Sequence, residues 1–338
     1  MLSKQETLQY KGAAIIIMVF LHLFDVRSNL LLCDISLYLL GEPLVFQIVK
    51  FSLICVPLYL FLSGYGLYIS FSKNVNWSPF KRILKLYLNF WVVCIFFIPL
   101  AIYLKPEFYP GGFKEIIKNF TGWHTTYNNE WWFLFPYVLL VLTSSGIFRL
   151  VKSATLTVLL FAVIFCYIFF YIITYFINDT FPSNHFLYIL ISYLNCLPHF
   201  VLGATFAKYD LFSVLKRKIQ IKTVWMNIFW ITLFFFIVFL RAVSPTSIVN
   251  ILVLILFICW FAVLKKNTIF IFLLERLGRQ STNIWLVHTF FCYYLFHDWI
   301  YGLRYPIVIF VTTLLLSFLS GILIDKFYQP LQKVIIKK

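Results

Sequence analysis

Two ionisable side chains lie inside the first apolar stretch of the sequence. His22 is about ten residues, or roughly 15 Å, into a helix that begins near Gly12. Asp25 follows three residues later and so shares a helical face with His22. A carboxylate beside a buried imidazole could fix its tautomer and stabilise its protonated form. His22 and Asp25 are therefore candidates for catalysis, the alternative being a packing hydrogen bond by His22 and an interfacial position for Asp25.

Two further histidines lie within later apolar segments. His288 is in the middle of an expected helix and could line the same cavity as His22. His199, close to Asn195, could line this cavity too, but we favour a packing hydrogen bond for it, because polar groups commonly bond across helices in membranes. No pair of these residues has a spacing typical of a metal site, and no metal is expected.

Glu130 marks the outer start of another apolar segment. It follows Asn128 and Asn129, at the end of a loop over residues 105–130, and precedes Trp131-Trp132-Phe133. One interpretation is a solvated acid beside an aromatic belt. The other is a carboxylate at the mouth of a cavity, where it could act as a base or bind a sugar hydroxyl.

A group of cations stands at the start of the third apolar segment. Lys81, Arg82 and Lys85 occupy one short stretch, and residues 82 and 85 share a helical face. The N-terminus of a helix attracts anions through its free N–H groups and its dipole, so a phosphate would fit here. The alternative, for Lys11 as well, is an ordinary cytoplasmic anchor.

The elements that must position these residues are membrane helices. The 338 residues are 62% hydrophobic and only 12% charged, and their mean hydropathy is +0.91. A charged share of about 25% is usual in soluble domains, so a soluble globule is excluded, and disorder would need the opposite bias. The seven Cys have no short-spaced pairs, which argues against a disulfide framework or a zinc cluster.

About ten apolar segments are long enough to cross a bilayer. Runs of this length lack the alternation of a membrane β-barrel, so we expect helices. The predicted fold is a single all-α, polytopic helical bundle over residues 1–338. The expected spans are 12–32, 44–71, 82–104, 131–148, 154–177, 186–207, 223–241, 246–264, 281–297 and 305–325.

The positive charges predict the orientation of this bundle. With the N-terminus in the cytoplasm, 21 of the 28 Lys and Arg fall on the cytoplasmic side and 7 on the other. An even number of crossings then places both termini in the cytoplasm, with the first helix uncleaved. Because the charges lie between apolar segments instead of forming a basic face, nucleic acid is not an expected partner.

The same residues resemble the acyltransferase-3 family of membrane acyltransferases. That family carries a basic residue, usually Arg, followed after ten residues by His, and two basic residues three apart at its third helix. The resemblance is distributed in order over nearly the whole chain. It comprises Lys11 with His22, the run Val56-Pro57 to Ser63-Gly64, Arg82 with Lys85, Trp132-Phe133-Leu134, and finally Leu277-Gly278, Ser281 and Leu286-Val287-His288.

Two features depart from the family pattern. Lys replaces Arg at positions 11 and 85, which keeps the charge and loses the bidentate guanidinium fork. The acid that many members carry after the Trp motif is not at that place, and Glu130 precedes the motif instead.

The resemblance implies O-acetylation of a cell-surface glycan of the capsule, exopolysaccharide or O-antigen type. Acetyl-CoA would be the cytosolic donor, with its phosphates on Lys11, Lys81, Arg82 and Lys85. His22 would be the general base or the acyl acceptor, with Asp25 or Glu130 orienting it and His288 assisting. The partners are then the lipid bilayer and the polysaccharide or its lipid-linked precursor, and the location is a bacterial inner or plasma membrane.

Two other classes of membrane protein remain open. A flippase for a lipid-linked oligosaccharide would use buried histidines and cations to hold a pyrophosphate, but its cations should run through the central cavity. A glycan polymerase would favour a large outer loop rich in Arg, whereas the 105–130 loop holds three Lys and no Arg. Acyl transfer is therefore the leading hypothesis.

Overall fold

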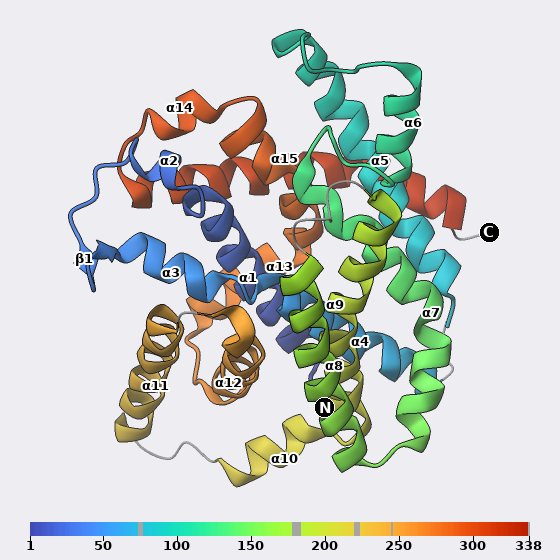
Figure 1. Cartoon of the computed structure of the whole chain (residues 1–338), viewed down its shortest axis with the longest axis vertical. Helices are drawn as coiled ribbons and strands as arrows, with labels where there is room; N and C mark the ends of the chain where they lie inside the picture. Colours follow the sequence, from blue (N-terminus) through green and yellow to red (C-terminus); the bar gives the residue numbers. More distant parts are fainter. Residues whose placement is uncertain (74–76, 178–183, 220–223, 245, 337–338) are drawn as a thin grey trace.

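Apolar helices make up most of the structure, a computed structural model that describes all residues except 74–76, 178–183, 220–223, 245 and 337–338 (Figure 1). The strands within the described residues are one short antiparallel pair, β1 (Tyr38–Leu39) and β2 (Glu42–Pro43). The predicted all-α polytopic bundle is confirmed. Three of the lysines counted on the cytoplasmic side, Lys222, Lys337 and Lys338, lie outside the described residues, as does residue 223 at the start of the seventh expected span.

The helices follow one another through the whole chain with short connections. In order they are α1 (Lys4–Phe24), α2 (Arg27–Leu30), α3 (Leu44–Ser52), α4 (Cys55–Ser72), α5 (Pro79–Leu104), α6 (Phe113–Thr121), α7 (Leu134–Ser153), α8 (Leu156–Ile177), α9 (His185–Lys208), α10 (Leu211–Lys218), α11 (Val224–Val243), α12 (Asn250–Val263), α13 (Thr268–Thr289), α14 (His297–Tyr301) and α15 (Pro306–Ile336). A 3₁₀ turn, Asn129–Phe133, leads into α7, and a π-helical stretch, Phe290–Tyr294, follows α13.

Seven helices in the described chain are long and apolar enough to cross a membrane. They correspond to expected spans and comprise Lys4–Phe24, Leu44–Ser72, Pro79–Leu104, Asn129–Ser153, Leu156–Phe176, His185–Lys208 and Pro306–Ile336. Two shorter apolar helices, Ile228–Val243 and Asn250–Val263, match the seventh and eighth expected spans. The ninth expected span corresponds to α13, which is longer than that span but more polar than the seven long apolar helices.

The first and ninth helices differ from their predicted bounds. α1 begins at Lys4 because Ser3 and Glu6 form a reciprocal capping box, and it ends at Phe24 instead of continuing to residue 32. α13 begins at Thr268, not near residue 281, because Asn267 caps it and the polar side chains of its first half find partners on neighbouring helices. One such partner pair is Gln9 Nε2 of α1 donating to Glu275 Oε1 at 3.3 Å.

Glycine lets two pairs of helices cross at backbone contact. A Cβ at Gly12 or Gly278 would collide with the facing backbone where α1 crosses α13. The same holds for Gly64 and Gly203 where α4 crosses α9. Small residues commonly allow such close crossings in membranes. The crossings fix α1 and α4 within the bundle, and these two helices carry His22 and Val56 of the site described below.

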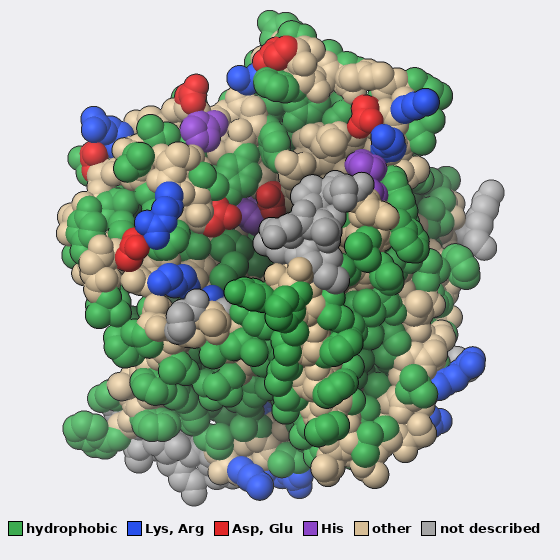
Figure 2. Space-filling view, in the orientation of Figure 1, with side chains coloured by type: hydrophobic (Ala, Val, Ile, Leu, Met, Phe, Trp, Pro, Cys, Tyr) green, Lys and Arg blue, Asp and Glu red, His purple; other side chains and the backbone are tan. Residues whose placement is uncertain are grey.

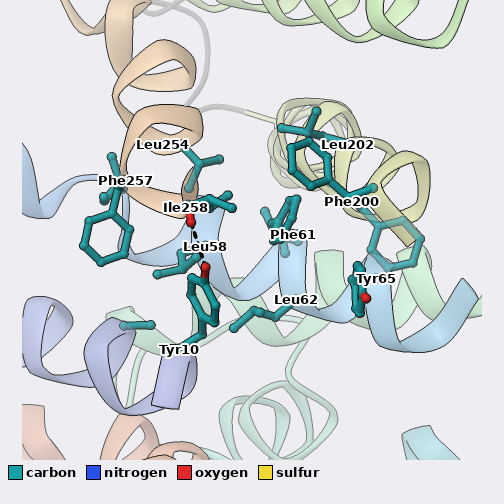
Figure 3. Packing of buried hydrophobic residues seen from close by; sticks show 14 of the residues in the cluster. Tyr10, Leu58, Phe61, Leu62, Tyr65, Phe200, Leu202, Leu254, Phe257 and Ile258 are labelled. Atoms are coloured by element: carbon teal, nitrogen blue, oxygen red, sulfur yellow. Dashed lines mark hydrogen bonds between the residues drawn. The ribbon is translucent and has the colours of Figure 1, made fainter. Parts of the chain in front are cut away.

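Aromatic side chains fill the core between α1, α4, α9 and α12. Figure 3 shows Tyr10 of α1 directed at α12, where its hydroxyl donates to the Ile258 carbonyl at 2.7 Å. Phe61 of α4 and Phe200 of α9 are fully buried in the same cluster. Pairs of buried aromatic rings add about 0.5–1.5 kcal/mol beyond their area, so this cluster holds the four helices firmly together.

The charged side chains lie at two margins of the molecule, with a hydrophobic belt between them (Figure 2). At one margin the N-terminal amine pairs with Asp210 at 2.6 Å, and Lys216 of α10 pairs with Glu6. At the other margin Arg27 pairs with Glu42 at 3.0 Å and Arg304 with Asp34 at 3.3 Å. This arrangement agrees with the predicted orientation, in which the N-terminus and α10 share the cytoplasmic side.

Candidate functional site

His22 lies between two carboxylates from different parts of the chain. Its Nε2 is 3.5 Å from Glu130 Oε2, and its Nδ1 is 4.0 Å from Asp25 Oδ2. The His22 side chain is only 13% exposed. Nδ1 has no hydrogen-bond partner within the described structure. Because Nδ1 is also buried, Nε2 is the nitrogen available for chemistry. An imidazole held this way can take up a proton and be stabilised once charged.

Asp25 and His288 complete the surroundings of His22. Asp25 Oδ1 accepts a hydrogen bond from the Tyr293 hydroxyl at 2.7 Å. The His288 ring lies 5.2 Å from the His22 ring, centre to centre. His288 Nδ1 is 2.9 Å from the Trp285 carbonyl. Because a carbonyl only accepts, Nδ1 carries the proton, and Nε2 of the neutral ring is an acceptor. Glu130, Asp25 and His288, all predicted from the sequence, are thus brought together around His22.

The 3₁₀ turn Asn129–Phe133 positions Glu130 by attaching to α13. Asn128 Oδ1 accepts from the Glu130 backbone N–H at 3.1 Å, and Asn128 Nδ2 donates to Thr289 Oγ1 at 2.7 Å. Trp285 Nε1 donates to the Glu130 carbonyl at 3.3 Å. No sequence pattern indicates the roles of Asn128, Tyr293 or Trp285, because their partners are distant along the chain. The π-helical stretch that carries Tyr293 is a type of distortion often found at functional sites.

A cavity of about 420 Å³, lined by several cations, lies toward the expected cytoplasmic side of the bundle. Lys11, Arg82 and Lys85 line it, together with Arg279, which counts among the 21 Lys and Arg expected on the cytoplasmic side. Lys81 is exposed at the start of α5 and is not among the described residues that line the cavity. Four cations from three helices, against the single carboxylate of Asp325 among the described lining residues, give the cavity a positive lining that suits a phosphate.

Polar groups with unused hydrogen-bonding capacity face the same cavity. Arg82 Nη2 donates to Ser70 Oγ at 2.9 Å, while its Nε has no partner among the described residues. Asn89 Nδ2 donates to Asn283 Oδ1 at 2.6 Å, and the structure describes no partner for Asn89 Oδ1. A buried polar atom without a partner is costly, so both groups are ready to bind a ligand.

A second cavity, of about 450 Å³, lies on the outer side and reaches His22. It is enclosed by the outer parts of α1, α4, α8 and α9 and by the 3₁₀ turn, and Val56 lines this cavity and the cytoplasmic one alike. Figure 2 shows acidic and histidine side chains gathered in a hollow on the visible face. The two cavities therefore meet at Val56, and His22 lines the outer one.

His199 differs from its predicted role. It lines the outer cavity, and neither ring nitrogen makes a well-aligned hydrogen bond in the described structure, although the backbone of Asn195 on the same helix lies close to the ring. The expected packing hydrogen bond to another helix is therefore wrong for the described residues.

Comparison with known proteins identifies the family. The acyltransferase-3 family model, described as an acyltransferase domain, matches residues 10–326, which is nearly the whole chain. The curated proteins and the solved structures gave no match to this chain. The matched range contains all of the residues that surround His22 and all of the cations in the cytoplasmic cavity.

Proposed function

The chain belongs to the acyltransferase-3 family of membrane acyltransferases, and from this premise we propose that it moves an acetyl group from cytosolic acetyl-CoA to a hydroxyl of a cell-surface glycan. The glycan would be of the capsule, exopolysaccharide or O-antigen type, in a bacterial inner or plasma membrane. The observation that carries the proposal is the position of His22, which stands between a cationic cytoplasmic cavity and an outer cavity. Such a site can receive a donor and an acceptor from opposite sides.

The donor would bind in the cytoplasmic cavity. Arg82, Lys85, Lys11 and Arg279 offer charge to the phosphates of CoA, and Lys81 adds charge at the surface nearby. The amide of Asn89 could bind the pantetheine arm, whose amides can donate to its unpaired Oδ1. The thioester would then extend past Val56 toward His22. Pockets of 300–1,000 Å³ are usual for drug-sized ligands, so the cavity of about 420 Å³ would hold part of the donor.

His22 would act at the acceptor hydroxyl. As general base, Nε2 takes the hydroxyl proton while the acceptor oxygen attacks the thioester carbonyl; the C–S bond then breaks, and the proton passes to the CoA thiolate. As nucleophile, Nε2 would first attack the thioester carbonyl, and the C–S bond would break to release the CoA thiolate and leave an acyl-imidazole; the acceptor oxygen would then take the acetyl group, its proton would pass to the thiolate, and free His22 would be restored. Both routes produce a positively charged imidazole, which the carboxylates of Glu130 and Asp25 stabilise.

The distribution of charge favours acyl transfer over a flippase. A pyrophosphate crossing the membrane needs cations along its route, yet the Lys and Arg that line the two cavities in the described structure are all in the cytoplasmic one. The outer cavity offers His22 and His199 as its ionisable bases.

Transfer of radiolabel tests the function directly. We expect purified protein in lipid nanodiscs to move label from [¹⁴C]acetyl-CoA to an extract of lipid-linked or polymeric surface glycan, with free CoA released in equal amount. Heat-denatured protein is the control. If the protein neither binds acetyl-CoA saturably nor releases CoA, the proposal fails, and movement of a fluorescent lipid-linked oligosaccharide across the bilayer would instead support a flippase.

Arg82→Gln is expected to weaken donor binding and leave the chemical step largely intact. The change removes a guanidinium from the cytoplasmic cavity, so the KM for acetyl-CoA should rise about tenfold to a hundredfold, as for loss of a charged hydrogen bond of roughly 1.5–3 kcal/mol. Steady-state CoA release measures it. Lys152→Gln, an exposed cation at the end of α7, is the matched control. Equal effects of the two substitutions would mean that Arg82 serves only as a cytoplasmic anchor.

A further inference from the structure

The outer cavity has a neutral lining that differs sharply from the cytoplasmic one. Among its described residues there is no Lys, Arg, Asp or Glu. One wall is apolar and comes from α1 and α4, with Leu21, Leu53, Pro57 and Leu60. The opposite wall comes from α8 and α9 and carries polar groups, Thr174, Ser192, Asn195 and His199. A phosphate or a sugar acid would be desolvated here without a cation to compensate, which is unfavourable.

His199 is the strongest sign that a polar ligand enters this cavity. His199 is only 6% exposed, and neither of its ring nitrogens makes a well-aligned hydrogen bond in the described chain, the nearest backbone group being that of Asn195 on its own helix. Tyr167 packs edge to face against the ring at 5.5 Å between centres, which fixes its orientation. A buried imidazole offers one donor and one acceptor, and leaving both unused costs free energy. A ligand with hydroxyl groups could use both.

Two aromatic residues and an amide give the cavity the character of a carbohydrate site. Trp132 and Tyr188 contribute rings to the lining, and aromatic surfaces can cover the apolar C–H face of a sugar. Asn195 Nδ2 donates to Thr174 Oγ1 at 2.9 Å, which holds the amide in place on the polar wall. The cavity of about 450 Å³ is far larger than one water molecule requires.

We propose that the outer cavity binds one uncharged sugar unit of the acceptor, with His199 hydrogen-bonded to one of its hydroxyls while another hydroxyl reaches His22. The inference rests on the proposed function and adds to it the class of acceptor and the residue that selects it. His22 and His199 line the same cavity, so a ligand that fills it contacts both. A long apolar ligand would leave the polar wall unpaired, and the observations therefore favour a sugar over a lipid chain.

Alkyl glycosides provide defined probes for this site. The full chain in nanodiscs, supplied with saturating [¹⁴C]acetyl-CoA, should acetylate octyl β-glucoside at least tenfold more efficiently, by kcat/KM, than octyl β-glucuronide, which carries a carboxylate. His199→Phe keeps a ring of similar size without nitrogen atoms and should raise the KM for octyl glucoside at least tenfold. His199→Gln restores hydrogen bonding and should recover most of this loss. Thr205→Val, buried on the same helix but outside the cavity, is the control.

The outcomes separate this inference from the proposed function. Slow hydrolysis of acetyl-CoA in the absence of glycoside, in which water takes the acetyl group and free CoA is released, should persist in His199→Phe, which shows that the variant folds and binds the donor. A glucoside KM unchanged in His199→Phe, equal use of glucoside and glucuronide, or transfer to octanol in preference to the glucoside would overturn the sugar site. If the wild type releases CoA yet acetylates neither glycoside, the neutral-sugar assignment is also wrong. A wild type that neither binds nor consumes acetyl-CoA contradicts the proposed function itself.

Discussion

Replacing His22 with alanine should lower the rate of acyl transfer by about a thousandfold or more. The substitution removes the only nitrogen base that lies, in the described structure, within 3.5–4.0 Å of both Glu130 and Asp25. General acid–base catalysis by one side chain contributes about 10²–10⁴-fold, and a nucleophile contributes at least as much. Single-turnover transfer of label from [¹⁴C]acetyl-CoA to glycan measures the loss.

The controls for His22→Ala distinguish lost chemistry from lost structure. Binding of acetyl-CoA should be retained, because His22 does not line the cytoplasmic cavity. His297→Ala provides a matched histidine at the outer surface, where the imidazole contacts Asp298 at 2.8 Å, and this variant should keep its activity. Transfer by His22→Ala within threefold of the wild type would contradict the assignment. Trapping of acetyl label on the wild-type protein at His22, absent from the variant, would select the acyl-imidazole route.

The sequence predicted the parts of the site that depend on helical periodicity. His22 and Asp25 are three residues apart on α1, and Arg82 and Lys85 are three apart on α5, so spacing alone places each pair on one helical face. The ten expected spans likewise follow from apolar length, and each has a helix at its place in the structure.

Contacts between distant segments could not be predicted in this way. Glu130 meets His22 only because the 3₁₀ turn attaches to α13 through Asn128 and Trp285, and neither residue has a sequence pattern that names its partner. Arg279 precedes the expected ninth span, which starts at residue 281. In the structure it lies inside α13, which begins at Thr268, and it lines the cytoplasmic cavity. Local spacing determines a helix face, whereas tertiary packing determines which faces meet.

The family signature combines residues of two kinds. Gly64 and Gly278 are needed where helices cross, since any Cβ there would meet the facing backbone. Ser63, next to Gly64 in the sequence, and Ser281, three residues after Gly278, line the cytoplasmic cavity. A short motif such as Ser63-Gly64 therefore joins a packing requirement to a binding one. Only the contacts of each residue in the folded chain show which of the two is required for packing and which lines the cavity.

Glu130→Gln should reduce acyl transfer about a hundredfold to a thousandfold, and Asp25→Asn should have a smaller effect of about tenfold. Glu130 approaches Nε2, the nitrogen that reacts in the proposed mechanism, at 3.5 Å, whereas Asp25 is 4.0 Å from Nδ1 and is also engaged by Tyr293. Both substitutions keep the shape of the side chain and remove the charge that stabilises the imidazolium. A hundredfold loss corresponds to about 2.7 kcal/mol of transition-state stabilisation.

The comparison should be made on kcat with saturating donor and glycan, because neither carboxylate lines the cytoplasmic or the outer cavity in the described chain. KM for acetyl-CoA should stay within about threefold of the wild type in both variants. If Asp25→Asn proves the more damaging, Nδ1 has its orienting partner in Asp25, and the role of Glu130 is confined to the acceptor hydroxyl. If Glu130→Gln keeps full activity, an acid placed before the Trp motif does not replace the one that many family members carry after it.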